Sequence, residues 1–211
     1  MVIAILVGSL FTGSVVAAPV TVVATGTVWS TGGLSGFSVG QTFSLTYGLD
    51  PNAPDFNSGS AIYGDYRTAA TNVRVAVGSY EATAPTGGVL IENNDGSPTY
   101  DDGKPDKYFF HSAQCRYAGF LYCDSVSGAD VDGRFLYSIE MQLYDPTGTS
   151  LASDALPYTE LPLAGFPATP ILSSDGNTLL ALRFATVDLG GSAHDGVASV
   201  KASITSPTLV P

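Results

Sequence analysis

Residues 134–145, RFLYSIEMQLYD, decide the fold class of this chain. Apolar side chains occupy every second position of this stretch, namely Phe135, Tyr137, Ile139, Met141 and Leu143. Polar side chains fall between them, at Ser138, Glu140 and Gln142. A period of two is typical of a half-buried β-strand, whereas an amphipathic helix repeats every three or four residues. We therefore predict a strand that turns its apolar set toward a core.

The same alternation recurs along the chain. It is clear in TFSLTYGLD (42–50), TNVRVAV (71–77) and VASVKASI (197–204). Further candidate strands cover residues 20–29, 87–93, 106–112, 120–126 and 177–189, which makes about nine strands in all. Turn dipeptides such as Asp132-Gly133 separate them. In the 177–189 stretch, Leu179 and Leu180 both look buried, which indicates either a β-bulge or a strand covered on both faces.

These strands predict an all-β fold, and we expect an antiparallel β-sandwich of the jelly-roll type. The chain has 211 residues, of which 45% are hydrophobic and 13% charged, so it has enough apolar material for one core. We expect a single domain over residues 19–206. Residues 207–211 read as an extended C-terminal tail.

The N-terminus resembles a secretory leader. Residues 1–18 are apolar or small and end in Val16-Ala17-Ala18 before Pro19. Small residues at that point are the pattern of a signal-peptide cleavage site, although the usual basic residue near the start is missing. The alternative is a buried first strand. We predict export from this leader. No later stretch reaches the roughly 18 to 20 apolar residues of a membrane-spanning helix, so we expect a secreted or cell-surface protein.

The two cysteines, Cys115 and Cys123, are separated by seven residues in QCRYAGFLYCD. This spacing differs from the C-x-x-C pattern of redox and zinc sites. In an exported protein a local disulfide is the natural interpretation, and two reduced thiols are expected if the chain is not exported.

Acidic side chains outnumber basic ones by 19 to 8, which gives a formal net charge of −11. Nucleic-acid binding draws on clustered Lys and Arg, so nucleic acid is excluded as an expected partner. An acidic polysaccharide would also be repelled unless divalent cations bridged the two surfaces.

Catalytic patterns are scarce. The sequence contains no Ser-x-x-Lys, G-x-S-x-G or His-Glu-x-x-His motif, and its only histidines are His111 and His194. Glycosidases with jelly-roll folds use two carboxylates on adjacent strands, for which Glu92 and Glu140 are the strand candidates. No second carboxylate shares the face of Glu140 two or four positions away, so we predict no catalytic residues and a protein that is not an enzyme.

One acidic segment, NNDGSPTYDDGKPDK (93–107), is a candidate calcium loop. Its candidate ligands are Asn93, Asp95, Asp101, Asp102 and Asp106. Calcium prefers hard oxygen ligands of this kind, although the spacing matches no fixed calcium motif. Asp-Gly pairs also build ordinary solvated turns. Calcium is the one cofactor that the sequence suggests.

Aromatic residues surround this segment, with Tyr100, Tyr108, Tyr117 and Tyr122 the closest in sequence. Exposed rings could stack on sugars. Aromatic side chains also fill cores and pair across strands, and we expect packing to be their main role.

A family resemblance rests on the two ends of the domain. The stretches ATGTVWSTGGLSGFSVGQTFSLTYGLDPNAPDF (24–56), SSDGNTLLALRFATVDL (173–189) and ASITSPTLVP (202–211) resemble bacterial secreted proteins of the PEP-CTERM, or exosortase-sorted, type. In that family Val-Pro-Glu-Pro, an apolar helix and a basic end follow the domain, whereas here the match reaches Val210-Pro211. The resemblance implies release from the cell if the chain is complete, and a surface or matrix protein if it continues. It supplies no catalytic residues, and it implies an association with extracellular polysaccharide.

We therefore expect a secreted, non-catalytic bacterial matrix or cell-surface protein with a structural or adhesive role. Its expected partners are extracellular polysaccharide or other matrix proteins. The alternative is a carbohydrate-active enzyme that pairs Glu140 with an acid near Asp101 and Asp106. A third possibility is a fibre subunit that exchanges an edge strand.

Overall fold

The computed structural model describes residues 18–60, 62–93, 106–113, 125–145, 147–148, 150–151, 153, 155–156, 179–186 and 197–210. Every regular element within these ranges is a β-strand. The strands are β1 (Val20–Ser30), β2 (Thr42–Leu49), β3 (Tyr63–Val77), β4 (Tyr80–Glu92), β5 (Asp106–Ala113), β6 (Ser127–Gly128), β7 (Phe135–Asp145), β8 (Leu179–Ala185) and β9 (Ala198–Val210). No helix in the described part of the chain is long and apolar enough to cross a bilayer.

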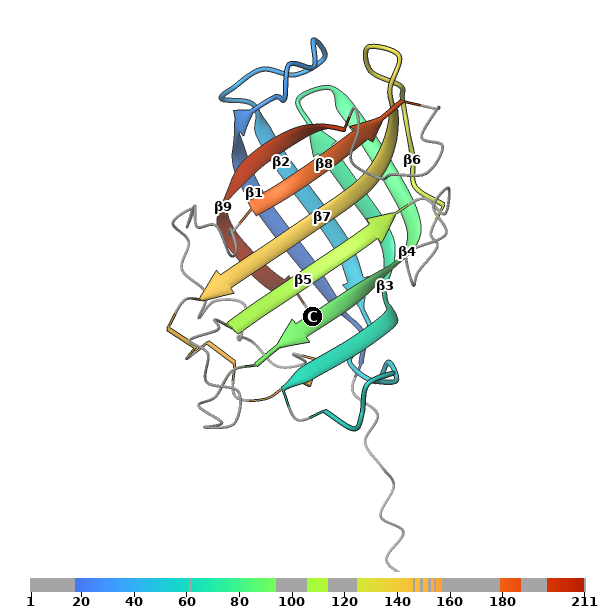
Figure 1. Ribbon diagram of the computed structural model, residues 1–211, viewed down its shortest axis with the longest axis vertical. Coiled ribbons are helices and arrows are strands. Elements are labelled where there is room, and N and C mark those ends of the chain that lie inside the picture. The colour runs from blue at the N-terminus through green and yellow to red at the C-terminus, as the bar shows by residue number, and fades with distance from the viewer. Residues whose placement is uncertain are drawn as a thin grey trace, which may run out of the picture.

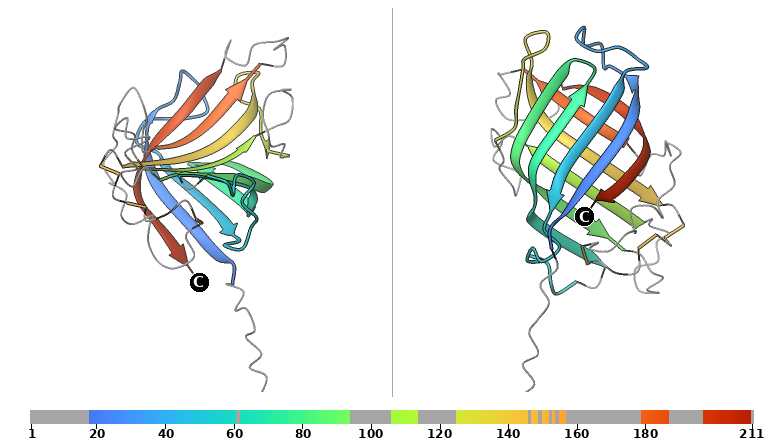
Figure 2. Two further views of the ribbon diagram at one scale, coloured as in Figure 1. Left: turned by 60° about the horizontal axis from the view of Figure 1, so that its bottom comes forward. Right: turned by 180° about the vertical axis from the view of Figure 1, so that it is seen from behind.

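The strands form a closed barrel, so the predicted jelly-roll sandwich is wrong. Each long strand pairs antiparallel with the next along the chain, and β9 returns to pair with β1. The β3–β4 hairpin completes a ring of eight strands, while β6 pairs with β4 outside that ring. In Figure 1 the strands β1 and β2 cross behind β5, β7 and β8, and in the right-hand view of Figure 2, seen from behind, they lie in front. A sandwich would leave two sheets with open edges, whereas here one sheet closes on itself.

The β1–β9 pairing that closes the ring is tight. Its register shifts between Thr25 and Gly26, and Gly26 lies directly against the backbone carbonyl of Ser203. A side-chain carbon at Gly26 would overlap that carbonyl, so glycine is required at this close approach. β9 continues to Val210, so residues 207–210, expected as a tail, belong to the last strand.

The barrel interior is filled by the apolar set that the alternation predicts. Phe43, Leu45, Tyr47 and Leu49 of β2 are all completely buried in one core cluster. The predicted set of β3, Val73, Val75 and Val77, joins the same cluster. Eight strands enclose a space that side chains alone can fill, and this barrel uses it as a core.

The first half of β7 differs from the predicted alternation. The register shifts between Leu136 and Ser138, which identifies a β-bulge around Tyr137. As a result Leu136 lies in the barrel core with Ile139, Met141 and Leu143. Phe135 and Tyr137, which we expected on that same face, pack instead in a separate cluster with Ala185.

Residues 179–182 of β8 are buried on both faces, as one of the two alternatives for residues 177–189 requires, while Arg183 is exposed. Leu179 and Leu180 are both buried, and the β8–β9 pairing has no register shift. The β-bulge on this side belongs to β7.

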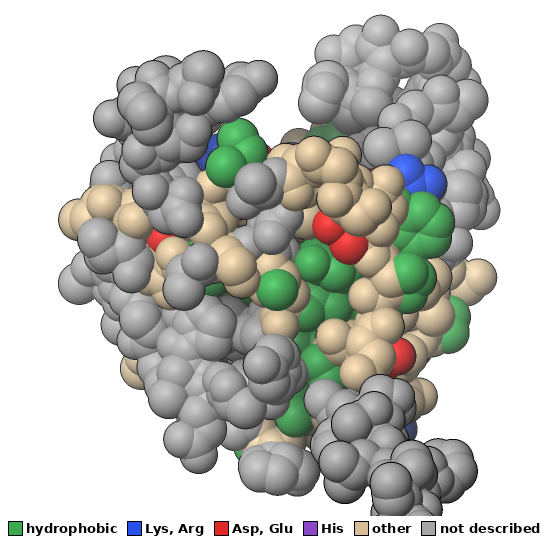
Figure 3. Space-filling view, turned by 90° about the horizontal axis from the view of Figure 1, so that it is seen from below, with side chains coloured by type: hydrophobic (Ala, Val, Ile, Leu, Met, Phe, Trp, Pro, Cys, Tyr) green, Lys and Arg blue, Asp and Glu red, His purple; other side chains and the backbone are tan. Residues whose placement is uncertain are grey.

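Side chains from the connecting segments also belong to the core. Leu34 and Phe37 belong to the core and come from the segment between β1 and β2, with the Phe37 ring 5.2 Å from that of Tyr80. Leu151 and Leu156, after β7, belong to the same core. Figure 3 views the molecule from below and shows hydrophobic side chains beside acidic ones.

Several predictions fall on residues that the structure does not describe. Residues 1–17 of the predicted signal peptide, most of the predicted strand 120–126, and both cysteines, Cys115 and Cys123, lie outside the described residues. The described part of the chain contains no disulfide. Two strands begin earlier than the predicted ones: β3 begins at Tyr63 and not at residue 71, and β4 begins at Tyr80 and not at residue 87.

Candidate functional site

A shallow groove lies on the outer face of β4, β5 and β7. Its volume is about 200 Å³, and its lining residues are Leu90, Glu92, Lys107, Phe109 and Gln142. All five of these side chains are half-buried. We call this feature the β4–β5–β7 groove.

Strand alternation explains why these residues meet outside the barrel. In β5, Tyr108 and Phe110 are buried in the core, so Lys107 and Phe109 between them point outward. In β4 and β7 the lining residues likewise alternate with core residues. The register then places Leu90, Phe109 and Gln142 side by side across three strands, as the pairs Leu90↔Phe109 and Phe109↔Gln142.

Charge in the groove is paired. The Lys107 ammonium lies 3.0 Å from the Glu92 carboxylate, and the two residues are direct neighbours across β4 and β5. Both side chains remain partly exposed, so the pair offers a donor and an acceptor to solvent. The groove therefore presents polar groups with no net charge of its own.

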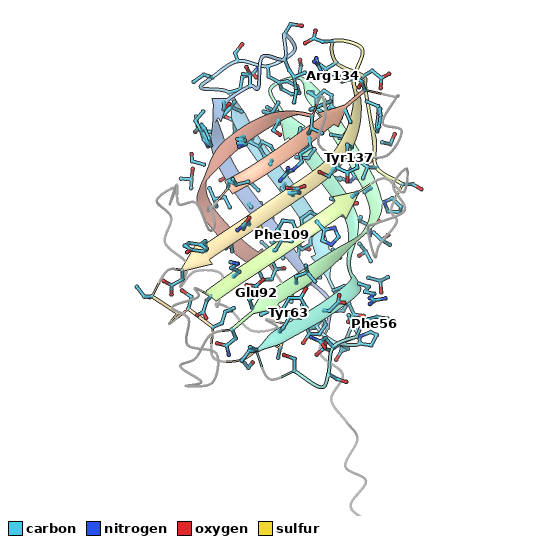
Figure 4. The ribbon with its side chains drawn as sticks, viewed as in Figure 1. Phe56, Tyr63, Glu92, Phe109, Arg134 and Tyr137 are labelled. Atoms are coloured by element: carbon cyan, nitrogen blue, oxygen red, sulfur yellow. The ribbon has the colours of Figure 1, made fainter. Side chains whose placement is uncertain are left out.

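Phe109 is the aromatic residue of the groove, and His111 packs against it. The ring of Phe109 stacks on His111 with centroids 5.4 Å apart and an angle of 18° between planes. His111 is buried, and its neighbour in the β5–β7 pairing is Glu140. Figure 4 shows Phe109 on the near side of the barrel, with Glu92 and Tyr63 on neighbouring strands below it.

Tyr63 of β3 is the cross-strand neighbour of Glu92, one of the lining residues of the groove. Its side chain is half-buried. Burial raises the pKa of the Tyr63 phenol, and the negative charges of Asp65 and Glu92 raise it further. The phenol thus stays protonated at neutral pH and can donate a hydrogen bond.

An ionic cluster lies next to the groove on the same outer face. The Nε of Arg183 lies 2.8 and 2.9 Å from the two carboxylate oxygens of Glu140, and Ser138 Oγ donates to the same carboxylate at 2.8 Å. Glu140 is only 9% exposed. A carboxylate held by Arg183 and Ser138 is a structural anchor between β7 and β8.

The strand carboxylates considered for catalysis do not converge. Glu92 pairs with Lys107, and Glu140 with Arg183. Asp106 lies on the core side of β5 and faces Asp145, five residues from Glu140 along β7, a separation of roughly 16 Å along the strand. Paired glycosidase carboxylates lie about 5 to 10 Å apart in one groove, so Glu140 and Asp106 do not form such a pair. Asp101 lies outside the described residues.

Two of the five candidate calcium ligands are described. Asn93 and Asp106 are both buried, at 2% and 0% exposure, and they lie at one end of the barrel instead of in a solvated loop. Asp95, Asp101 and Asp102 lie outside the described residues. Within the described ranges, no group of three or more His, Cys, Asp or Glu side chains is placed to hold a metal ion.

Of the four tyrosines noted around this segment, only Tyr108 is described. It is completely buried, and its hydroxyl lies 2.8 Å from that of Tyr47, so it is a core residue and not a sugar platform. The partly exposed aromatic among the described residues of this region is its neighbour Phe109, which is half-buried. Sequence reasoning missed it because Tyr108, Phe109 and Phe110 read as one apolar run; the alternation of β5 with Lys107 is the signal that identifies it.

No protein-family model, curated protein or solved structure matches this chain. The resemblance to PEP-CTERM proteins therefore stays a prediction.

Proposed function

We propose that this protein is an exported, non-catalytic carbohydrate-binding protein whose β4–β5–β7 groove takes a neutral sugar ring of an extracellular polysaccharide. The observation that carries the proposal is the combination of the Phe109 ring with the Glu92–Lys107 pair in one groove. Export and the extracellular location rest on the apolar leader of residues 1–18 and on the family resemblance.

The chemistry of the groove fits a sugar. A pyranose ring has an apolar C–H face, which packs on an aromatic ring, and a rim of hydroxyl groups, each both donor and acceptor. Phe109 and Leu90 supply apolar contact, while Glu92, Lys107 and Gln142 supply charged and amide hydrogen-bonding groups around it. Hydrogen bonds to charged groups are stronger than neutral ones, and a few convergent polar groups on an apolar surface set ligand orientation.

The size of the groove and the net charge of the chain narrow the range of suitable ligands. Its volume of about 200 Å³ is below the range of about 300 to 1,000 Å³ typical of pockets for drug-sized ligands, so it suits one ring of a chain that continues over the surface. The net charge of −11 repels acidic polysaccharides. A neutral glycan is therefore the favoured ligand class.

A glycan array with neutral and acidic oligosaccharides tests this proposal. We expect retention of neutral glycans, and we expect Phe109→Ala to weaken it about tenfold or more. Phe56→Ala is the matched control, because Phe56 is an exposed aromatic (56%) that packs with Arg67 away from the groove. The proposal fails if no neutral glycan is retained, or if Phe109→Ala and Phe56→Ala bind as the unchanged protein does.

A further inference from the structure

Trp29, the only tryptophan of the chain, lies on the outer surface of the barrel. Its neighbour Val28 is buried in the core, so the indole points outward from β1, and the residue is 40% exposed. Tryptophan is highly buried on average in folded proteins, because its ring has a large apolar area. The exposed indole is therefore an apolar surface on which a ligand can pack.

A lysine from the neighbouring strand lies over this ring. Lys201 lies on β9 between the core residues Val200 and Ala202, so its side chain also points outward. Its Nζ is 5.8 Å from the centre of the Trp29 ring, which is within the range of a cation–π contact. We call these two residues the Trp29–Lys201 pair.

The ammonium of Lys201 is not neutralised by a neighbouring acid. Its cross-strand neighbours are Ser30 on β1 and Ala181 on β8. Among the described residues, no carboxylate forms an ion pair with it. The strands β1, β2 and β9 contain neither Asp nor Glu, although the chain has 19 acidic side chains. Lys201 can therefore donate hydrogen bonds to a ligand that packs on the indole.

Hydroxyl groups lie beside the pair on the same outer face. Thr27 lies two positions before Trp29 on β1, and it pairs with Ser203 on β9 and with Thr42 on β2. Both threonines are exposed, and Ser203 is half-buried. Each hydroxyl is both a donor and an acceptor. An aromatic ring bordered by such groups suits a sugar, which has an apolar C–H face and a rim of hydroxyls.

The Trp29–Lys201 pair and the β4–β5–β7 groove lie on opposite sides of the barrel. In the ring of eight strands, four pairings separate β1 from β5 through β9, β8 and β7, and four separate them through β2, β3 and β4. Figure 1 shows β5 on the near side with β1 behind it, and the right-hand view of Figure 2 shows β1 in front. Trp29 and Phe109 both point outward, so one sugar ring cannot contact both.

We propose that the Trp29–Lys201 pair is a second binding site for a neutral sugar ring, so that one molecule cross-links two segments of polysaccharide. This second site rests on the proposed function of the groove and adds a role to it. The indole packs on the C–H face of the sugar, and the Lys201 ammonium and the Thr27 hydroxyl bind its hydroxyl groups. Each polysaccharide chain offers many rings, so two sites on opposite faces strengthen retention through multivalency.

Tryptophan fluorescence tests the site, because Trp29 is the only tryptophan of the chain. The probe is a neutral hexasaccharide that the glycan array retains. We expect a saturable shift of the emission to shorter wavelength and weaker quenching by acrylamide, in Phe109→Ala as in the unchanged protein. The inference is overturned if the emission does not change, or if Phe109→Ala abolishes the change, because the indole would then report binding in the groove.

Two charge variants test the part of Lys201. Lys201→Met removes the charged donors, so it should weaken the affinity measured by fluorescence about tenfold. Arg74→Met is the matched control, because it removes an exposed cation from β3 and should leave the affinity unchanged. An unchanged affinity in Lys201→Met overturns the assignment of the site to this pair.

Beads coated with the same hexasaccharide test cross-linking. The unchanged protein and Phe56→Ala should aggregate the beads, whereas Trp29→Ala and Phe109→Ala should each bind to the beads without aggregating them. If Trp29→Ala aggregates the beads as the unchanged protein does, the second site is wrong and the groove stands. If Trp29→Ala loses all binding while Phe109→Ala binds unchanged, the groove is wrong and the Trp29–Lys201 site stands.

Discussion

The hydroxyl oxygens of Tyr47 and Tyr108 lie 2.8 Å apart inside the barrel, although the two residues belong to β2 and β5. Both side chains are completely buried, and the ring of Tyr47 stacks on Phe110 with centroids 4.4 Å apart. The pair satisfies two polar groups across the width of the core. It also connects two strands that are not neighbours in the sheet.

Removing one hydroxyl of this pair should lower the free energy of unfolding more than removing both hydroxyls. Tyr108→Phe leaves the Tyr47 hydroxyl buried without this partner, which we expect to lower the free energy of unfolding by about 1 to 3 kcal/mol. The double variant Tyr47→Phe/Tyr108→Phe should recover most of that loss, because two apolar groups then face each other. Urea unfolding of the four proteins measures the coupling. Additive losses in the double variant would show that the hydroxyls do not interact.

The same pair predicts a loss of stability at alkaline pH. Burial is the main cause that raises the pKa of both phenols above the ordinary value of 10.0, and burial also raises that of Tyr80 to about 12. The folded state then keeps protons that the unfolded state releases, so stability is complete below pH 10 and falls as the pH rises above it. Urea unfolding on both sides of this pH measures the fall. This loss of stability should be smaller in the Tyr47→Phe/Tyr108→Phe variant. An equal loss would show that these two phenols are not its cause.

The Glu140–Arg183 pair should act as an anchor and not as a catalyst. Arg183→Met leaves the Glu140 carboxylate, only 12% exposed in its side chain, without its cation. Because Arg183 is 44% exposed and solvent screens part of the interaction, we expect a loss of about 1 to 3 kcal/mol in chemical unfolding. The double variant Glu140→Gln/Arg183→Met should be more stable than Arg183→Met alone. If it is less stable, the unpaired carboxylate is not the cause of the loss.

The pKa of Asp132 should report on the contact between the segment after β1 and the turn before β7. A hydrogen bond from the Ser35 hydroxyl, then one from the Ser35 amide, then the charge of Arg134 lower the pKa of Asp132 below 3.8. The interaction is therefore present above that pH and is lost as the pH falls. Ser35→Ala should raise the pKa of Asp132 toward 3.8 without reaching it, because the amide still donates. A carboxyl NMR titration measures this, and an unchanged pKa would contradict the contact.

Sequence patterns predicted most of the strands but not the closure of the sheet into a barrel. Val73, Val75 and Val77 follow a simple alternation and are buried as expected. Alternation, however, reports only which side of a strand is apolar, and this is the same in a sandwich and in a barrel. Closure depends on the pairing of β1 with β9, strands from opposite ends of the chain, which no local pattern contains.

The candidate site was predictable only in part for a related reason. The sequence marked Glu92 as a strand carboxylate and Asn93 as a candidate calcium ligand, but their surroundings depend on the strand register. The register places Glu92 beside Lys107 outside the barrel, whereas the next residue, Asn93, is buried. Gln142 joins the groove because β7 is the neighbour of β5, and local sequence does not reveal this pairing because β6 lies between the two strands in the chain.

The central claim is that the β4–β5–β7 groove binds a neutral sugar. Its most direct test is an amide and side-chain NMR titration of the protein with a neutral oligosaccharide retained on the array. The claim predicts saturable shift changes at Leu90, Phe109 and Gln142, with Phe56 unaffected. Shift changes confined to residues outside the groove, or no saturable change at these three residues, would contradict it.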